Sequence, residues 1–284
     1  MILIDLNQVM ISNIMAQIGN HHNAMIDENM VRHMILNSLR SYRTKFKAEY
    51  GELVICADDK NYWRKKVYPY YKASRKRDRD KSELDWNGIF SAINNVKAEI
   101  KEIFPYKVIQ VEHAEADDAI GTLCHKYGQQ LNTGEPILIL SGDKDYIQLH
   151  MYANIKQYDP VRKRWISHND PCEYLQEHII RGDSGDGVPN ILSPDACLVE
   201  GERQKPVTKK RLNEFMTNDI NSWTEEYQRN WHRNQALIDL SSVPQAIKDQ
   251  VIEQFDKQPN DRSKLLNYFI KNKLRVLMEH ITEF

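Results

Sequence analysis

The sequence feature that most constrains this chain is a repeated unit, in which a short continuous apolar segment is followed at once by acidic residues. The apolar segments cover residues 2–4, 53–57, 108–111 and 137–140. The acids that follow them are Asp5, Asp58, Glu115 with Asp117 and Asp118, and Asp143 with Asp145. Continuous apolar runs of this length are typical of strands buried on both faces.

Amphipathic helical patterns separate these segments. Asp27 is placed to cap a helix whose apolar residues recur at helical spacing as far as Phe46. A second pattern of this kind ends at Ile103, before Pro105. Residues 154–158 are expected to add a fifth strand. Alternating strands and helices predict an α/β fold with a mostly parallel central sheet and helices on both faces.

The later part of the chain has a different pattern. No comparable strand is predicted beyond about residue 180, and residues 208–284 have a mostly helical pattern. We therefore expect an α/β core over residues 1–180 and a smaller helical region over residues 181–284. A chain of 284 residues suits either one large domain or two modest ones.

Composition excludes several classes of protein. Hydrophobic residues make up 41% of the chain and charged residues 28%, which is typical of a soluble globular protein. No apolar stretch is long enough to cross a membrane, and the N-terminus lacks the pattern of a signal peptide. Four widely spaced cysteines form no CxxC pair, which argues against structural zinc and a disulfide framework. We expect a cytoplasmic monomer with reduced thiols, in a host cytoplasm if a phage encodes it.

The acids are predicted to form a metal site. The carboxyl ends of parallel strands share one edge of a sheet, so acids that follow them converge on one crevice. Like charges so close require cations between them, and oxygen ligands favour Mg²⁺ or Mn²⁺ over Zn²⁺. Asp183 and Asp186, in a glycine-rich turn, are placed to close the site. So many acids suit two ions about 3.5–4 Å apart, the arrangement that serves in-line phosphoryl displacement.

A plainer interpretation exists for each acid taken alone, namely a helix cap or a solvated loop residue. Asp118 illustrates it best, since an acid in the first turn of a helix also complements the helix dipole. Repetition of the pattern after four strands weakens this alternative.

A basic and aromatic segment follows the second acidic position. Residues 62–81 contain nine Lys or Arg and two acids, a local charge of +7 that leaves −8 for the rest of a chain whose net charge is −1. Cations neutralise phosphates, and aromatic rings stack on bases at about 1–3 kcal/mol per base. The residues expected to contact nucleic acid here are Arg64, Lys65, Lys66, Tyr71 and Arg77. The alternative is a solvated basic loop whose aromatic residues anchor it to the core.

Taken together, these motifs resemble the flap endonuclease/5′ nuclease family, most closely its bacteriophage RNase H branch. The elements that carry the resemblance are Ile4-Asp5-Leu6, Cys56-Ala57-Asp58, Tyr70-Tyr71-Lys72, Glu115-Ala116-Asp117-Asp118, Ser141-Gly142-Asp143-Lys144-Asp145, and Gly182-Asp183 with Asp186. They occur in the family's order, and Leu237-Ile238-Asp239-Leu240 extends the likeness towards the C-terminus.

The resemblance implies a PIN-like 5′ nuclease core, a helical arch at about residues 62–88 and a two-metal site for Mg²⁺ that tolerates Mn²⁺. The implied metal-site residues are Asp5, Asp58, Glu115, Asp117, Asp118 in an outer shell, Asp143, Asp145, Asp183 and Asp186. Lys72 and Arg75, at the base of the arch, would contact the scissile phosphate. The implied activity removes RNA primers from RNA–DNA hybrids and 5′ flaps from DNA during replication. The implied partners are flapped or nicked DNA, and replication proteins such as a clamp or a single-strand-binding protein.

One departure from the family affects the expected helix–hairpin–helix turn, which grips duplex DNA and often holds K⁺. The turn over residues 187–194 lacks Gly-Ile-Gly, which puts a K⁺ site in doubt. Lys205, Lys209 and Lys210 are expected to contact duplex backbone instead. The alternative is that Lys209 and Lys210, with Arg211, form a solvated helix face.

Three alternatives were weighed against a 5′ nuclease. A haloacid dehalogenase-type phosphatase needs a second Asp two residues after its nucleophile, but Asp5 is followed by Leu6 and Asn7. A PIN-type ribonuclease shares the acidic sheet but lacks so long a basic arch. A non-catalytic DNA-binding protein would not need acids at every motif position.

Overall fold

One six-stranded sheet organises the chain in the computed structural model, which describes residues 1–18, 27–82, 84–129, 131 and 134–284. The strand order is β3-β2-β1-β4-β5-β6, and the first five strands are parallel. The strands are β1 (Ile2–Asp5), β2 (Leu53–Cys56), β3 (Lys107–Ile109), β4 (Ile137–Leu140), β5 (Ile155–Asp159) and β6 (Arg164–Ile166). The predicted mostly parallel sheet is confirmed. The antiparallel edge strand β6, which follows a short turn after β5, was not predicted.

Side chains of the central strands alternate between two separate cores. Ile2, Ile4 and Ile55 point into one core, with α1 (Leu6–Ile18), α2 (Glu28–Tyr50) and α5 (Trp86–Ile103). Leu3 and Val54 point into the other, with α6 (Ala116–Tyr127) and α11 (Gln245–Asp256). Because successive strand residues face opposite sides, a sheet covered on both faces needs uninterrupted apolar strands. This explains the apolar runs in the sequence.

Local signals begin and end the helices as predicted. The Asp27 side chain caps α2 by accepting a hydrogen bond from the Asn29 amide at 2.9 Å. Gly51, with φ +82°, follows the last turn of α2, and α5 ends at Ile103, before Pro105. No described helix is both long and apolar enough to cross a membrane.

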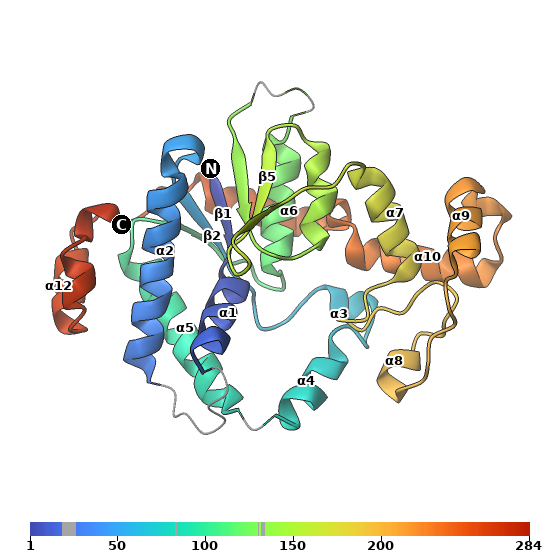
Figure 1. Cartoon of the computed structure of the whole chain (residues 1–284), viewed down its shortest axis with the longest axis horizontal. Coiled ribbons are helices and arrows are strands. Elements are labelled where there is room, and N and C mark those ends of the chain that lie inside the picture. The colour runs from blue at the N-terminus through green and yellow to red at the C-terminus, as the bar shows by residue number, and fades with distance from the viewer. Residues whose placement is uncertain (19–26, 83, 130, 132–133) are drawn as a thin grey trace.

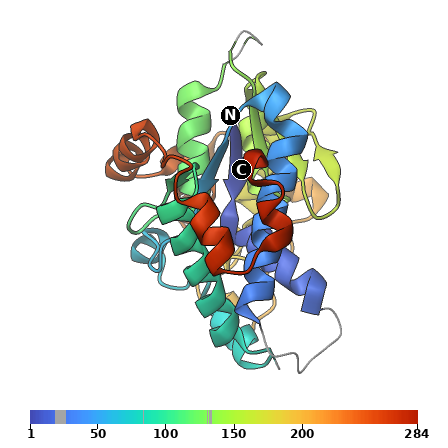
Figure 2. The same cartoon turned by 90° about the vertical axis from the view of Figure 1, so that its left-hand side faces the viewer.

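The helices of the C-terminal region occupy three places. Those that lie to the right in Figure 1 are α7 (Pro171–Arg181), α8 (Cys197–Glu200), α9 (Lys209–Thr217) and α10 (Glu225–Ile238). The helix α11 packs on α6 and β3, behind the sheet. Beyond it, α12 (Leu265–Lys271) and α13 (Arg275–Met278) pack beside α2 and α5, where Phe284 is buried (Figure 2). Residues 245–284 therefore cover the α/β core, although the sequence placed them in a separate helical region.

The basic segment forms α3 (Arg64–Val67) and α4 (Ala73–Asp80). Both lie beyond the carboxyl ends of the strands, on the side where α1 begins (Figure 1). Their base is fixed by the turn that follows α7, since the Lys72 amide donates to the Asp186 carbonyl at 2.7 Å. Gly187, with φ +77°, makes this close approach possible, because a Cβ there would lie 3.1 Å from the Tyr70 carbonyl oxygen.

Candidate active site

The sheet brings the predicted acids to one edge. Asp5 ends β1, Asp58 lies two residues beyond β2, and Asp143 lies three residues beyond β4. Because β1 lies between β2 and β4, this is the point at which the strand order reverses, where open α/β sheets bind ligands. Asp117 joins them from the first turn of α6.

Four of these acids form what we call the strand-end group: Asp5, Asp58, Asp117 and Asp143. Burial, reinforced by the charges of Asp58 and Asp143, raises the pKa of Asp5 to about 7. Burial also raises the pKa of Asp117, with further contributions from Asp143 and Asp5. These effects show that Asp5 lies within electrostatic reach of Asp58, Asp117 and Asp143, and that these carboxylates repel one another when ionised.

Neighbouring side chains and amides hold these carboxylates in place. Asp58 accepts a hydrogen bond from the Ala116 amide at 2.8 Å and another from Asn7 Nδ2 at 2.6 Å. Asp5 accepts one from the Gln8 amide at 3.0 Å. The Tyr146 hydroxyl donates to Asp117. The oxygens are thus oriented by the protein, but none of these donors carries the positive charge that the group needs.

The donor set of the strand-end group fits divalent cations. Four buried or largely buried carboxylates supply only oxygen, and the Lys72 ammonium lowers the pKa of each without balancing all four charges. Hard cations of the Mg²⁺ and Mn²⁺ type bind such oxygen sets.

Other predicted acids form a second set, the paired group, which consists of Glu115, Asp118 and Asp186. Glu115 is 2% exposed and accepts hydrogen bonds from Lys72 Nζ and, at 3.0 Å each, from Arg64 and the Tyr71 hydroxyl. Burial raises the pKa of Glu115, but Lys72 and Arg64 outweigh it and hold the pKa below its usual value. Asp186 pairs with Lys72 and Arg75.

Asp118 turns away from the strand-end group. One carboxylate oxygen accepts from the Glu115 amide at 2.8 Å and from Trp63 Nε1 at 3.0 Å, and the other lies 2.8 Å from Arg64. The carboxylate therefore caps α6 and anchors α3. These contacts suit the helix-cap interpretation, and a metal-related role for Asp118 stays a prediction.

Two of the residues expected to bind nucleic acid are buried inside the protein. Arg64 is 2% exposed, and its guanidinium also donates to the Leu237 carbonyl at 2.8 Å. Tyr71 is 3% exposed, with its hydroxyl shared between Glu115 and Asp186. Neither position suits contact with a phosphate or a base, because each side chain is enclosed by protein groups. Both residues brace the site from within.

The remaining predicted nucleic-acid contacts are on the surface. Their side chains are exposed in α3, α4, the loop before α9, and the start of α9: Lys65, Lys66, Arg77, Lys205, Lys209 and Lys210. Exposure permits contact with a phosphate backbone, and their role stays a prediction.

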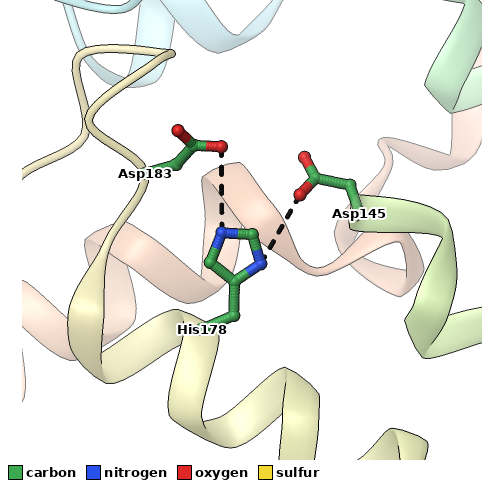
Figure 3. A group of neighbouring side chains, drawn as sticks. All are labelled: Asp145, His178 and Asp183. Atoms are coloured by element: carbon green, nitrogen blue, oxygen red, sulfur yellow. Dashed lines mark ion pairs between the residues drawn. The ribbon is translucent and has the colours of Figure 1, made fainter. Parts of the chain in front are cut away.

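A third cluster consists of Asp145, His178 and Asp183. Asp145 begins the 3₁₀ helix η1 (Asp145–Met151), and burial together with the charge of Asp143 raises its pKa to about 8. His178, from α7, lies between Asp145 and Asp183 (Figure 3). Burial lowers the pKa of His178, but Asp183 and Asp145 outweigh it and raise the pKa.

The altered turn after α7 is held by amide side chains. Asn230 Nδ2 donates to the Ile191 carbonyl at 2.8 Å, and Asn234 Nδ2 donates to the carbonyls of Ile179 and Pro189 at 2.8 and 2.9 Å. Both asparagines are fully buried in α10. They were not predicted, since asparagines within a helical pattern carry no signal of their partners.

Asn7, Tyr146 and His178 were likewise not predicted. Asn7 directly follows the first acid motif and Tyr146 the fourth, so proximity to these motifs was the available signal. His178 lies in a helical segment five residues before Asp183, and no spacing in the sequence indicates that contact.

Comparisons with known proteins agree with this geometry. A family model described as "5′-3′ exonuclease, N-terminal resolvase-like domain" matches residues 1–178, and one described as "T4 RNase H, C terminal" matches residues 173–284. Ribonuclease H of Enterobacteria phage T4 is 33% identical across 99% of this chain and 95% of that protein. Flap endonuclease Xni of Shewanella denitrificans is 27% identical across 60% of this chain and 66% of that protein.

Solved structures share the fold. The T5 flap endonuclease, in a pseudo-enzyme–product complex with DNA and metal ions, aligns with a TM-score of 0.62 at 15% identity, covering 90% of this chain and 99% of that one. The T5 5′-exonuclease with bound zinc ions aligns with a TM-score of 0.59 at 14% identity, covering 90% of this chain and 98% of that one.

Proposed function

The chain belongs to the 5′–3′ exonuclease family with a resolvase-like N-terminal domain, and from this premise we propose that it removes RNA primers from RNA–DNA hybrids and 5′ flaps from DNA during replication. It is a 5′ nuclease, and dependence on divalent metal ions is part of the proposal. The full-length similarity to a phage ribonuclease H and the likeness to flap endonucleases support this choice of substrates. Action as a monomer beside a clamp or a single-strand-binding protein belongs to the same proposal.

One observation carries the proposal, namely that the strand-end group gathers four carboxylates whose charges the protein compensates only in part, through Lys72. We propose that two Mg²⁺ ions bind there and that Mn²⁺ can replace them. Asp5, Asp58, Asp117 and Asp143 would hold these ions, with Asp145 and Asp183 completing the set. When bound, such ions neutralise phosphate charge and lower the pKa of a water towards about 7.

Lys72 and Arg75 are proposed to act on the scissile phosphate. Lys72 Nζ interacts with every member of the strand-end group and also pairs with Glu115 and Asp186. Arg75 pairs with Asp186 and is about half exposed. A phosphodiester at the strand-end group would therefore meet two cations already in position to stabilise developing negative charge.

Exposed cations are proposed to bind the rest of the substrate. Lys65, Lys66 and Arg77 would contact the strand that passes α3 and α4. Lys205, Lys209 and Lys210 would contact duplex backbone near the start of α9, where Thr208 caps the helix. Cations on both sides of the acids would let a polyanion approach a site that otherwise repels it.

The decisive experiment compares the unaltered protein with Asp143→Asn on 5′-flap, nicked and RNA–DNA hybrid substrates, with Mg²⁺ and with chelator. We expect the unaltered protein to cleave from 5′ ends only with Mg²⁺. Loss of one metal carboxylate should reduce cleavage by at least about a hundredfold while DNA binding persists.

Two results would overturn the proposal. Cleavage of none of the substrates, together with affinity that Mg²⁺ leaves unchanged, would indicate a non-catalytic DNA-binding protein. Cleavage of single-stranded RNA without regard to its 5′ end would indicate a PIN-type ribonuclease.

A further inference from the structure

His178 occupies a distinctive position between two acids of the candidate site (Figure 3). Its Nδ1 lies 3.5 Å from Asp145 Oδ1, and its Nε2 lies 3.7 Å from Asp183 Oδ2. One donor atom from each of the three residues lies within 4.8 Å of the other two. The imidazole is therefore the nitrogen donor in a cluster whose other donors are carboxylate oxygens.

Three elements fix this arrangement. Asp145 begins η1, which packs against α7, and His178 lies in the last turn of α7. Gly182, with φ +67°, then turns the chain so that Asp183 returns towards the histidine; a Cβ on Gly182 would lie 2.5 Å from the carbonyl oxygens of Val188 and Pro189. The turn thus requires glycine, and it determines where Asp183 lies.

The spacing suits a shared ion better than direct pairing. Charge-assisted hydrogen bonds between a nitrogen and a carboxylate are usually about 2.7–2.9 Å long, and both contacts of His178 are longer. Ligand atoms that each lie about 2.1 Å from one ion are about 3–3.5 Å apart in octahedral or tetrahedral geometry. One ion can be bound by only one ring nitrogen, so one of the two His178 contacts is compared with this second spacing, and each is close to it.

One carboxylate oxygen of Asp183 is available to bind an ion. Its Oδ1 accepts hydrogen bonds from the Gly185 amide at 2.7 Å and the Asp186 amide at 3.2 Å. Its Oδ2 points to His178. The loop therefore orients the carboxylate by one oxygen and presents the other to the cluster.

We propose that His178 supplies a nitrogen ligand to the cation held by Asp145 and Asp183, so that this position prefers a first-row transition ion of the Mn²⁺ type to Mg²⁺. Imidazole is a poor ligand for Mg²⁺ and a common one for first-row transition ions. The other ring nitrogen can then donate to one oxygen of the carboxylate that faces it, while the second oxygen of that carboxylate binds the ion, as metal-bound histidines usually donate to a neighbouring acceptor. The inference rests on the proposed function, because it assigns Asp145 and Asp183 to one ion of that site.

Pulsed electron paramagnetic resonance on the Mn²⁺-loaded full-length protein tests this directly, since it detects coupling between Mn²⁺ and a ligating ¹⁴N nucleus. We expect nitrogen coupling in the unaltered protein and its loss in His178→Gln. The matched control is His280→Gln, which removes a partly exposed histidine that contacts Glu283 near the C-terminus and should keep the coupling.

A calorimetric Mn²⁺ titration adds a second readout. His178→Gln should weaken one class of Mn²⁺ sites by about tenfold to a hundredfold and change Mg²⁺ affinity much less. Equal losses for the two ions would overturn the preference for Mn²⁺.

The spectrum of the unaltered protein tests for a nitrogen ligand on Mn²⁺ even if the variant fails to fold. Failure to bind Mn²⁺, or Mn²⁺ binding without nitrogen coupling, overturns the inference, as does coupling that survives in His178→Gln. Mg²⁺-dependent cleavage by the same sample would leave the proposed function standing in any of these cases. Absence of cleavage on every substrate would overturn the proposed function instead.

Discussion

The paired group and the strand-end group contain the same kind of side chain at similar depth, yet they have opposite surroundings. Glu115 and Asp118 are buried against Arg64, and Glu115 also pairs with Lys72. Asp5, equally buried, has Asp58 and Asp143 as charged neighbours. The pKa of Glu115 is accordingly held below its usual value, whereas that of Asp5 is raised to about 7.

The acids of this site therefore serve two purposes: some form ion pairs within the protein, and others are available to bind cations. The motif Glu115-Ala116-Asp117-Asp118 contributes to both. The paired group connects α3, the base of α4 and α6, and each of its acids forms an ion pair with Arg64, Lys72 or Arg75. The strand-end group is electrostatically incomplete, which favours cation binding at the cost of stability. Glu115 thus belongs to the paired group and Asp117 to the strand-end group, although they are only two positions apart in the sequence. Substitutions in either group, a change of pH and an exchange of ions can each test this distinction.

Removing the cation at the centre of the paired group should have the largest effect. In Arg64→Met, Glu115 and Asp118 would remain buried without their guanidinium partner. Breaking a buried ion pair on one side costs about 3–5 kcal/mol. We expect a loss of this size in the free energy of unfolding, measured by urea denaturation.

The matched control for Arg64→Met is Lys66→Met, because Lys66 is exposed in the same short helix. It should change the free energy of unfolding by less than about 0.5 kcal/mol. Equal effects of the two substitutions would contradict the structural role of Arg64.

Lys72 forms ion pairs in the paired group and acts electrostatically on the strand-end group, so replacing it should separate catalysis from binding. In Lys72→Met, we expect the rate of cleavage at saturating DNA to fall by about 10²–10³-fold, because a positioned charge-stabilising group is lost. DNA affinity, measured by fluorescence anisotropy in Ca²⁺ or chelator, should change by less than about tenfold, since other exposed cations remain. A parallel loss of cleavage and affinity would assign Lys72 to substrate binding alone.

The strand-end group and Asp145 should make the metal-free protein less stable as pH rises. The pKa is raised to about 7 for Asp5 and about 8 for Asp145, against about 4 in the unfolded chain. Between about pH 4 and these values, the folded chain holds protons that the unfolded chain has released. The free energy of unfolding should therefore fall as pH rises, by roughly 2 kcal/mol for each of these two groups between pH 5.5 and 7.5.

Urea denaturation in chelator measures this fall, and Asp5→Asn is the control. The variant removes one titrating charge, so its pH profile should be flatter and its metal-free stability at pH 7.5 higher. Excess Mg²⁺ should flatten the profile of the unaltered protein as well, because the ions replace the protons. A stability that rises with pH in chelator would contradict the raised pKa values.

The smallest effect is expected from exchanging K⁺ for Na⁺. In the turn after α7, carbonyls of Pro189 and Ile191 already accept hydrogen bonds from Asn234 and Asn230. Carbonyls satisfied by protein donors have less need of a cation, so we expect duplex affinity to change by less than about twofold. A stronger dependence on K⁺ at constant ionic strength would reveal a cation site in this turn.

The sequence by itself determined where the parallel strands lie along the chain and which acids follow them. Apolar runs such as residues 2–4 and 137–140 can be buried only in a sheet covered on both faces, and parallel strands then place their trailing acids at one edge. The acid positions could be predicted because each depends on its own strand. The edge strand β6 could not be predicted, because its three residues, Arg164 to Ile166, are largely exposed and form no apolar run.

Only the tertiary structure decided which acids are paired and which are left for cations. Arg64 is 51 residues from Glu115 and 173 from Leu237, yet one guanidinium reaches both. His178 reaches Asp145 because η1 packs on α7. Such contacts depend on how separate elements pack, and side-chain partners across those distances leave no periodic signal in the sequence. The strand pattern therefore located the acids, while packing gave each its charge environment.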